Sequence, residues 1–194
     1  MARAPALPPE VRRASIVAAT LPLLRRYGRA VTTSQIALAA GVAEGTLFRV
    51  FADKDELIDA AILAAFDPKP SEAELERIDR SMDLRDTVIA AVEIMQRRVG
   101  EIWQLISSLQ LPAPAPTRPP PPTMDDSGVR AQLAALFAPH RDEIRCEPEH
   151  AARLLRALAF AGTHPRMTDQ PLTAHEITSL LLDGIRARPD EETA

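Results

Sequence analysis

The chain has 194 residues, of which 46% are hydrophobic and only 4% aromatic, and its formal net charge is −4. A single cysteine, Cys146, excludes an internal disulfide, and no apolar run approaches the about 20 residues that span a membrane. Alanine and aliphatic residues dominate, β-branched runs are sparse, and the N-terminus carries no hydrophobic signal stretch. These features predict an all-α, cytoplasmic protein with no membrane partner.

Charge is distributed unevenly along the chain. Residues 1–52 hold seven arginines against Glu10 and Glu44, a net charge of +5, whereas residues 53–194 hold 16 basic and 25 acidic residues, a net charge of −9. Cations that displace condensed counterions supply much of the affinity for DNA. The asymmetry therefore predicts that the N-terminal part of the chain contacts a nucleic-acid backbone.

The first predicted helix runs from Pro9 or Glu10 to Tyr27, and Gly28 ends it. Residues 1–8 are predicted to be disordered. Pro22 lies inside the helix and is expected to kink it, because proline removes one backbone hydrogen bond. The inward stripe is predicted from apolar residues at helical spacing, namely Ile16, Ala19, Leu23 and Tyr27.

Residues 31–54 predict two short helices joined by a glycine turn, an arrangement that enters the DNA major groove. Thr32 and Gln35 fit a capping box at the start of the first helix, and Gly41 suits a turn with positive φ. The inner edges are predicted to be Ile36, Ala37, Leu47 and either Val50 or Phe51. The outward positions of the second helix are polar or small: Ala43, Glu44, Gly45, Thr46 and Arg49.

This segment resembles the TetR family of transcriptional regulators over roughly residues 10–64. The resemblance is carried by Thr32-Thr33, Ile36-Ala37, Ala40-Gly41-Val42, Gly45-Thr46-Leu47-Phe48, Phe51, Lys54 and Leu57. It implies that residues 42–51 form the recognition helix and that Lys54 lies near the DNA backbone. Two departures are Phe48, where the family usually has tyrosine, and Pro22. The residues expected to contact double-stranded operator DNA are Thr32, Thr33, Ser34, Ala43, Glu44, Gly45, Thr46, Phe48, Arg49 and Lys54.

A domain boundary is predicted after the fourth helix. Asp53 is expected to cap that helix with Glu56 as its reciprocal partner, and the segment Asp67-Pro68-Lys69-Pro70 ends the unit. The predicted division is a helix-turn-helix domain at 9–66 and a helical ligand-binding and dimerisation domain at 67–194, with about nine helices in all.

The second domain is predicted to contain a short polar helix at 71–80 and a core helix at 84–109 with a possible break at Gly100. Residues 112–122, with seven prolines, form a predicted polyproline-like loop, interpreted as a plain connector, with a pocket lid or a recognition peptide as the alternative. Further helices are predicted at 126–138, 149–163 and 173–186.

Two sets of apolar residues are candidates for binding in this domain. A small-molecule effector pocket is predicted from Met95, Trp103, Phe137, Phe160 and Met167, although each of these residues taken singly is more often part of an ordinary core. The last two helices pair with those of a second copy in the TetR family. By that resemblance a homodimer interface is expected at Leu154, Leu158, Gly162, Ile177, Leu181 and Ile185.

Catalytic and metal-binding patterns are missing from the sequence. Cys146 and His150 have helical spacing, but Pro148 lies between them and no further zinc ligand is suggested. No phosphate-binding glycine loop, nucleophile–base pair or cofactor motif is recognisable. We therefore expect a homodimeric repressor, not an enzyme, that an apolar or amphipathic effector releases from its operator. The alternative is an all-helical enzyme or protein-binding module in which the helix-turn-helix is an ordinary structural hairpin.

Overall fold

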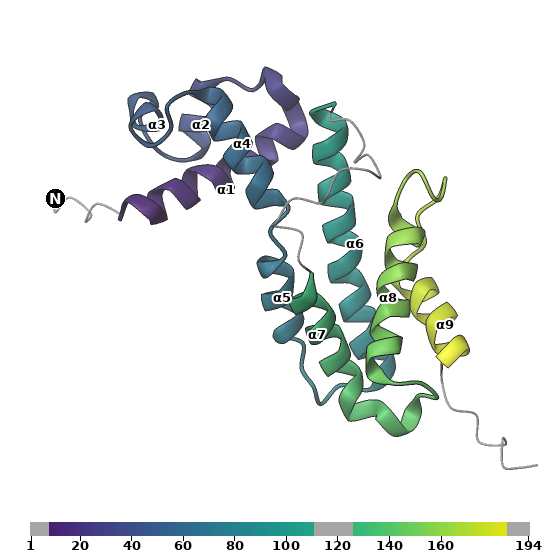
Figure 1. Ribbon diagram of the computed structural model, residues 1–194. Coiled ribbons are helices and arrows are strands. Elements are labelled where there is room, and N and C mark those ends of the chain that lie inside the picture. The colour runs from purple at the N-terminus through teal and green to yellow at the C-terminus, as the bar shows by residue number, and fades with distance from the viewer. Residues whose placement is uncertain (1–7, 111–125, 186–194) are drawn as a thin grey trace, which may run out of the picture. The chain divides into compact units, whose positions relative to one another are not determined.

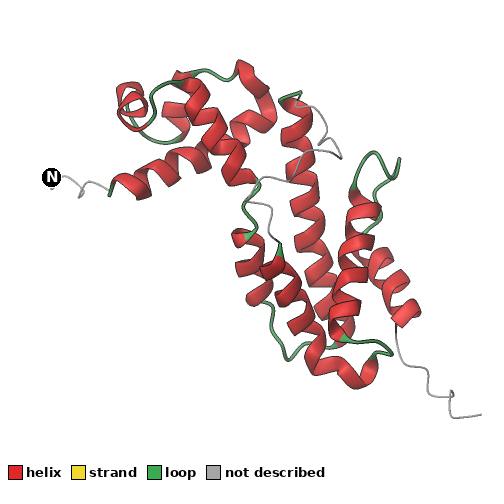
Figure 2. Ribbon diagram, viewed as in Figure 1, coloured by secondary structure: helices red, strands yellow, loops and turns green. Residues whose placement is uncertain are grey.

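The computed structural model describes residues 8–110 and 126–185, and its regular elements there are helices (Figures 1 and 2). The proline-rich segment 112–122 lies outside the described residues, and so do residues 1–7 of the segment 1–8 that was predicted to be disordered. Contacts within the chain divide it into two compact units. The first unit contains the chain up to Asp67 together with the end of α6 from Glu101, and the second contains Pro68–Gly100 and the described residues from 126 onward.

The first unit is built from α1 (Pro9–Tyr27), the short 3₁₀ helix η1 (Gly28–Ala30), α2 (Thr33–Ala39), α3 (Glu44–Val50) and α4 (Lys54–Ala65), with the C-terminal end of α6 (Leu84–Ser108). The predicted bounds of the first helix and its glycine stop are confirmed. Its core consists mainly of large aliphatic side chains and one phenylalanine: Ile16, Leu24, Val31, Ile36, Leu47, Phe51, Leu57, Ile58, Leu105 and Leu109.

The predicted inward stripe of α1 is partly wrong. Ile16 is buried, but Ala19 and Leu23 are only half-buried and Tyr27 is 39% exposed. The buried stripe instead contains Thr20, whose hydroxyl donates to the carbonyl of Ile16 over 2.8 Å. A threonine that bonds one turn back along its own helix satisfies its hydroxyl there, so it packs inward although it looks polar in the sequence.

Gly28 allows α1 and α6 to approach each other closely within the first unit. Its φ is +55°, and a Cβ atom built on it would lie 2.3 Å from the backbone oxygen of Ser108. Leu105 and Leu109 on the same stretch are buried in the core of the unit, and Arg25 pairs with Glu101 over 3.0 Å. The end of α6 is therefore an integral part of the first unit.

The possible break at Gly100 is not present, because α6 is one continuous helix from Leu84 to Ser108. A glycine in a helix interior costs only about 1 kcal/mol relative to alanine. Buried apolar residues on both sides of Gly100, including Val92 and Leu105, outweigh that cost.

The second unit is built from α5 (Lys69–Glu76), residues 84–100 of α6, α7 (Ser127–Phe137), the 3₁₀ helix η3 (Ala138–Glu143), α8 (Pro148–Thr163) and α9 (Ala174–Ile185). Its apolar core is separate from that of the first unit and includes Leu75, Val88, Val92, Leu133, Phe137, Leu155, Ile177 and Leu181. In the part of the chain that the structure describes, no helix is long and apolar enough to cross a membrane.

Candidate nucleic-acid interface

The start of α2 is fixed by a complete capping box. The hydroxyl of Thr32 accepts from the backbone N–H of Gln35 over 3.2 Å, and the Gln35 side-chain oxygen accepts from the N–H of Thr32 over 2.9 Å. Two backbone N–H groups that the helix itself leaves without partners are thereby satisfied. The predicted start of the helix-turn-helix is confirmed.

The turn between α2 and α3 also has the predicted geometry. Gly41 has a φ of +66°, and the N–H of Val42 donates to the carbonyl of Ala37 over 3.0 Å. Of the seven residues of α3, only Leu47 is fully buried, in the core under α1 and α2. Such a short helix has little stability of its own and depends on contacts at its ends.

The outer face of α3 is largely exposed and is chemically mixed. Glu44, Gly45 and Arg49 are exposed, Thr46 is half-buried, and the ring of Phe48 is 50% exposed. No heavy atom lies within 4 Å of a Cβ built on Gly45, so the backbone is open there. A large partner can approach the helix closely at this glycine.

Two further predicted DNA contacts make bonds within the chain. The Thr33 hydroxyl donates to the carboxylate of Glu44, which joins the N-terminal ends of α2 and α3. Lys54 donates from Nζ to the backbone oxygen of Arg29 over 2.8 Å. Lysine has two more N–H donors, so this bond leaves Lys54 able to meet a phosphate. Thr32 is exposed just before α2, Ser34 is exposed on α2, and Ala43 is exposed just before α3.

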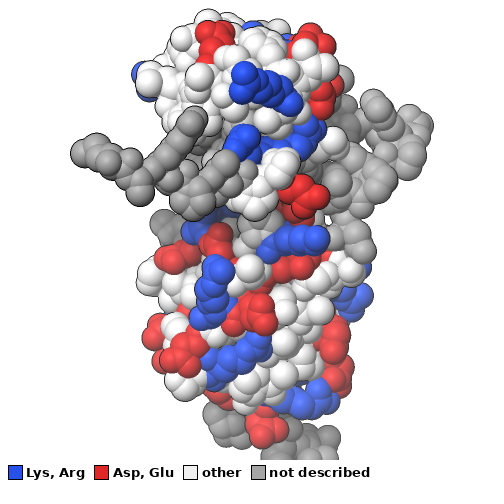
Figure 3. Space-filling model, turned by 90° about the vertical axis from the view of Figure 1, so that its left-hand side faces the viewer, with Lys and Arg blue, Asp and Glu red and all other residues white. Residues whose placement is uncertain are grey.

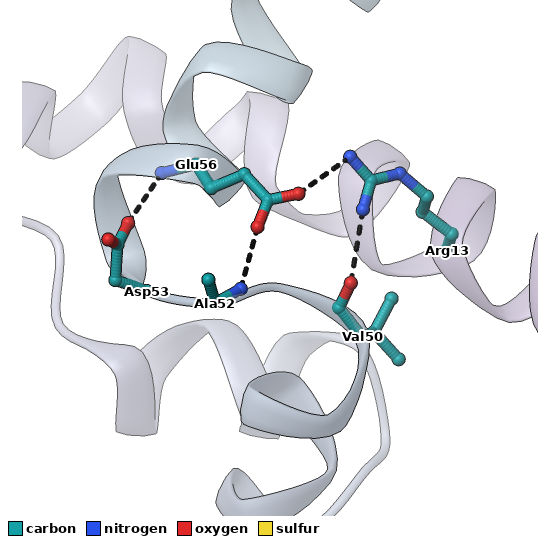
Figure 4. Close-up of polar contacts among 5 residues, drawn as sticks. All are labelled: Arg13, Val50, Ala52, Asp53 and Glu56. Atoms are coloured by element: carbon teal, nitrogen blue, oxygen red, sulfur yellow. Dashed lines mark hydrogen bonds and ion pairs between the residues drawn. The ribbon is translucent and has the colours of Figure 1, made fainter.

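The C-terminal end of α3 is held by Arg13 of α1 (Figure 4). Its Nη1 donates to the backbone oxygen of Val50 over 3.1 Å, and its Nη2 donates to Glu56 Oε1 over 3.2 Å. The other oxygen of Glu56 accepts from the N–H of Ala52 over 2.6 Å, and this bond holds the pKa of Glu56 below its ordinary value. Asp53 caps α4 through the N–H of Glu56, as predicted. The predicted reciprocal bond is displaced by one residue, from Asp53 to Ala52.

The strongly positive charge of residues 1–52 does not describe the folded unit. Residues 1–67 carry eight basic and seven acidic residues, a net charge of +1, because α4 brings in carboxylates that lie beyond residue 52. Arginines of the N-terminal segment pair with such groups, as Arg29 does with Asp55 over 3.4 Å. Basic and acidic side chains are interspersed on the face of the first unit shown in Figure 3. Local placement of each cation, not net charge, must therefore support DNA binding.

Residues 16–61 match the family model of the bacterial regulatory proteins of the tetR family. The chain carries a TetR-type DNA-binding domain in a TetR-type fold. The matched segment spans α1 to α4, so the helix-turn-helix formed by α2 and α3 is the family's DNA-binding element.

Solved structures of transcriptional regulators, among them TetR-family proteins, resemble most of this chain in fold. A TetR transcriptional regulator from Streptomyces coelicolor matches with a TM-score of 0.58 at 22% identity, over 90% of this chain and 98% of that one. A regulator of the family from Mesorhizobium loti matches with a TM-score of 0.57 at 14% identity, over 94% and 100%. A transcriptional regulator from Rhodococcus sp. RHA1 matches with a TM-score of 0.57 at 18% identity, over 91% and 99%. At these identities the likeness concerns the fold.

The five residues predicted to line an effector pocket have different surroundings. Met95 and Phe137 are buried in the core of the second unit, whereas Trp103 lies on the part of α6 that belongs to the first unit. Phe160 and Met167 are 47% and 64% exposed, on α8 and in the loop after it. The sequence pattern missed this because an apolar side chain at helical spacing is equally compatible with a core and with an exposed face.

Most residues predicted for the dimer interface face inward instead. Ile177, Leu181 and Ile185 are buried in the core of the second unit, and Gly162 packs against Ile177 of α9. Leu154 and Leu158 are half-buried against the same core. The exposed apolar residues on these two helices are Phe160 on α8 and Leu180 on α9, at 47% and 55%. Leu181, one residue further along α9, is buried instead, because successive side chains on a helix point about 100° apart.

Proposed function

We propose that the protein is a homodimeric repressor that binds double-stranded operator DNA through α2 and α3 and leaves it when a small effector binds. The observation that carries the proposal is the largely exposed outer face of α3 in a TetR-type helix-turn-helix. On that face Gly45 leaves the backbone open and Arg49 is exposed one turn further along. Arginine is suited to guanine because its planar fork donates to O6 and N7 together.

The DNA-binding part is tested with Arg49→Ala. Binding of fluorescently labelled intergenic DNA from beside the gene is measured by anisotropy, and we expect a loss of about 1–3 kcal/mol for the specific site. Arg77→Ala removes an exposed arginine at the end of α5 in the second unit and serves as the charge-matched control. Wild-type protein that binds no such DNA would favour the alternative, an enzyme or protein-binding module with a structural helix-turn-helix.

For the dimer interface we propose a surface other than the one expected from the sequence. A two-fold operator requires two recognition helices about one DNA turn apart, so the regulator must present two copies of α3. We place the interface on the exposed side of α8 and α9, with Phe160 and Leu180 at its centre. Leu180→Glu should convert a dimer to a monomer in light scattering at micromolar concentration. Leu63→Glu, at an apolar residue of α4 that is similarly exposed, should leave the dimer intact.

The effector part rests on the family resemblance and on the separate apolar core of the second unit, which includes Met95 and Phe137. An apolar or amphipathic molecule that binds there and releases DNA must itself bind DNA-bound protein more weakly by the same factor, typically five- to 150-fold. A thermal-shift panel of apolar compounds, followed by operator release with each hit, tests this part. A panel without any stabilising compound would contradict it.

A further inference from the structure

We propose that Arg13 is a positioning residue that holds the recognition helix α3 at its C-terminal end, and that it makes no phosphate contact. The proposal rests on the proposed DNA-binding function. Arg13 lies on α1, 37 residues before its first partner, and belongs to the arginine-rich segment whose charge suggests DNA contact. Its surroundings in Figure 4 indicate a different role.

The first contact caps α3. Val50 is the last residue of the helix, and its carbonyl is among the last four, which an α-helix leaves without an internal partner. Nη1 of Arg13 donates to this carbonyl over 3.1 Å. A cation at this position is also favoured by the partial negative charge at a helix C-terminus.

The remaining contacts fix the guanidinium itself. Nη2 donates to Glu56, and Glu56 is in turn fixed by the N–H of Ala52 just before α4. The flat face of the guanidinium lies 4.2 Å from the centre of the Phe51 ring, which is buried. One side chain of α1 therefore holds the end of α3, the link that follows it and the start of α4.

The position of α3 depends on such end contacts. Leu47 is the only fully buried residue of the helix, and Val50 packs against the same core while partly buried. The Thr33–Glu44 bond holds the N-terminal end of the helix, and Arg13 holds its C-terminal end. Base recognition needs side chains placed within about 0.5 Å of their productive geometry. Loss of the Arg13 contacts should therefore leave α3 folded but less well placed.

A positioning role and a phosphate contact predict different salt dependences. Loss of a phosphate contact weakens specific and non-specific binding alike and lowers the salt slope by about one. Each terminal nitrogen of Arg13 donates one bond within the protein, and one face of its guanidinium lies over the Phe51 ring, so the group is held in place by α3 and α4. Its loss should thus lower specific affinity and leave the slope unchanged.

The test compares Arg13→Gln and Arg13→Lys with two controls. Arg26→Gln removes an exposed charge from the same helix. Ile58→Val removes one methyl group from the core of the unit and changes none of the hydrogen bonds at the ends of α3. Affinity for specific and for random DNA is measured over a range of salt concentrations. Hydrogen exchange of the α3 amides is measured on the free protein, well below its unfolding temperature.

We expect Arg13→Gln to lose at least about tenfold in specific affinity, since charged hydrogen bonds are lost. Random-DNA affinity should match that of Arg26→Gln, and α3 amides should exchange faster while α2 amides do not. Arg13→Lys should recover part of the lost specific affinity, because lysine keeps the positive charge. The recovery should be incomplete, because an ammonium group cannot make both planar contacts.

Three results would overturn the proposal: a salt slope lowered by about one, unchanged α3 exchange, or an equal loss of specific affinity in Ile58→Val at matched stability. Failure of the wild type to bind any DNA would instead refute the proposed function. The exchange measurement on the free protein would still decide whether Arg13 positions α3.

Discussion

Gly28→Ala should destabilise the first unit far more than an ordinary glycine-to-alanine change. Two terms contribute. A non-glycine residue at φ +55° and ψ −143° is strained by about 1–3 kcal/mol, offset by about 0.4–1 kcal/mol because alanine restricts the unfolded chain. The new methyl group would also lie 2.3 Å from the oxygen of Ser108, a backbone atom that cannot turn away.

The steric term is estimated from the displacement that the methyl group demands. Carbon atoms in proteins settle at about 3.5–4.0 Å from their neighbours, so the end of α6 or the turn at Gly28 must move by about 1 Å. Overpacking of this kind costs about 1–3 kcal/mol. The total is about 1–6 kcal/mol, a large part of the about 5–15 kcal/mol that stabilises a typical domain.

Gly41→Ala is the matched control. Gly41 has a similar φ of +66°, but no heavy atom lies within 4 Å of a Cβ built on it. The steric term is therefore present in Gly28→Ala and absent from Gly41→Ala. Urea unfolding followed by fluorescence of Trp103, the one tryptophan of the chain, reports on the first unit. Equal free energies of unfolding for the two variants would refute the close approach of Gly28 and Ser108.

Three further outcomes are expected. Thr178→Val should stabilise the protein by about 1 kcal/mol in urea unfolding, because the buried hydroxyl of Thr178 has no partner among the described residues. Thr20→Val, which removes a bonded hydroxyl, should bring no such gain. The bond from Ala52 lowers the pKa of Glu56 in the folded protein. The contribution of ionised Glu56 to the free energy of unfolding is therefore present above the ordinary pKa of 4.5 and is lost as pH falls through the folded pKa. Acid unfolding followed by Trp103 fluorescence should consequently be less steep for Glu56→Gln. Lys54→Ala should weaken specific and random DNA binding alike and lower the salt slope by about one.

Features that depend on neighbours in the chain were predictable from the sequence. The Thr32–Gln35 capping box and the Asp53 cap join residues that are three apart, so both partners can be identified from the amino-acid sequence. The turn at Gly41 is equally local, because positive φ is a property of one residue. The family resemblance rests on this local pattern, and the match over residues 16–61 covers the same region.

Features that depend on distant partners were not predictable. Helices α8 and α9 carry apolar residues on more than one side, and only the packing of the second unit decides that Leu181 is buried and Leu180 is not. The role of Arg13 likewise depends on a carbonyl 37 residues away. The net charge of residues 1–52 includes Arg13 but not its carboxylate partner, because that partner is Glu56.

Because the end of α6 belongs to the first unit, the core of that unit cannot be completed until α6 has been translated. When Asp67 has been made, the helices that match the TetR model are complete, but Leu105 and Leu109 of their core are not yet translated. The ribosome must add residues 68–109, 42 residues, which takes about 2–8 s at about 5–20 residues per second. During that interval the nascent DNA-binding unit exposes apolar surface that only a later part of the chain can cover. A fragment that ends at Asp67 would keep this defect permanently and should be less stable than the same helices in the full chain.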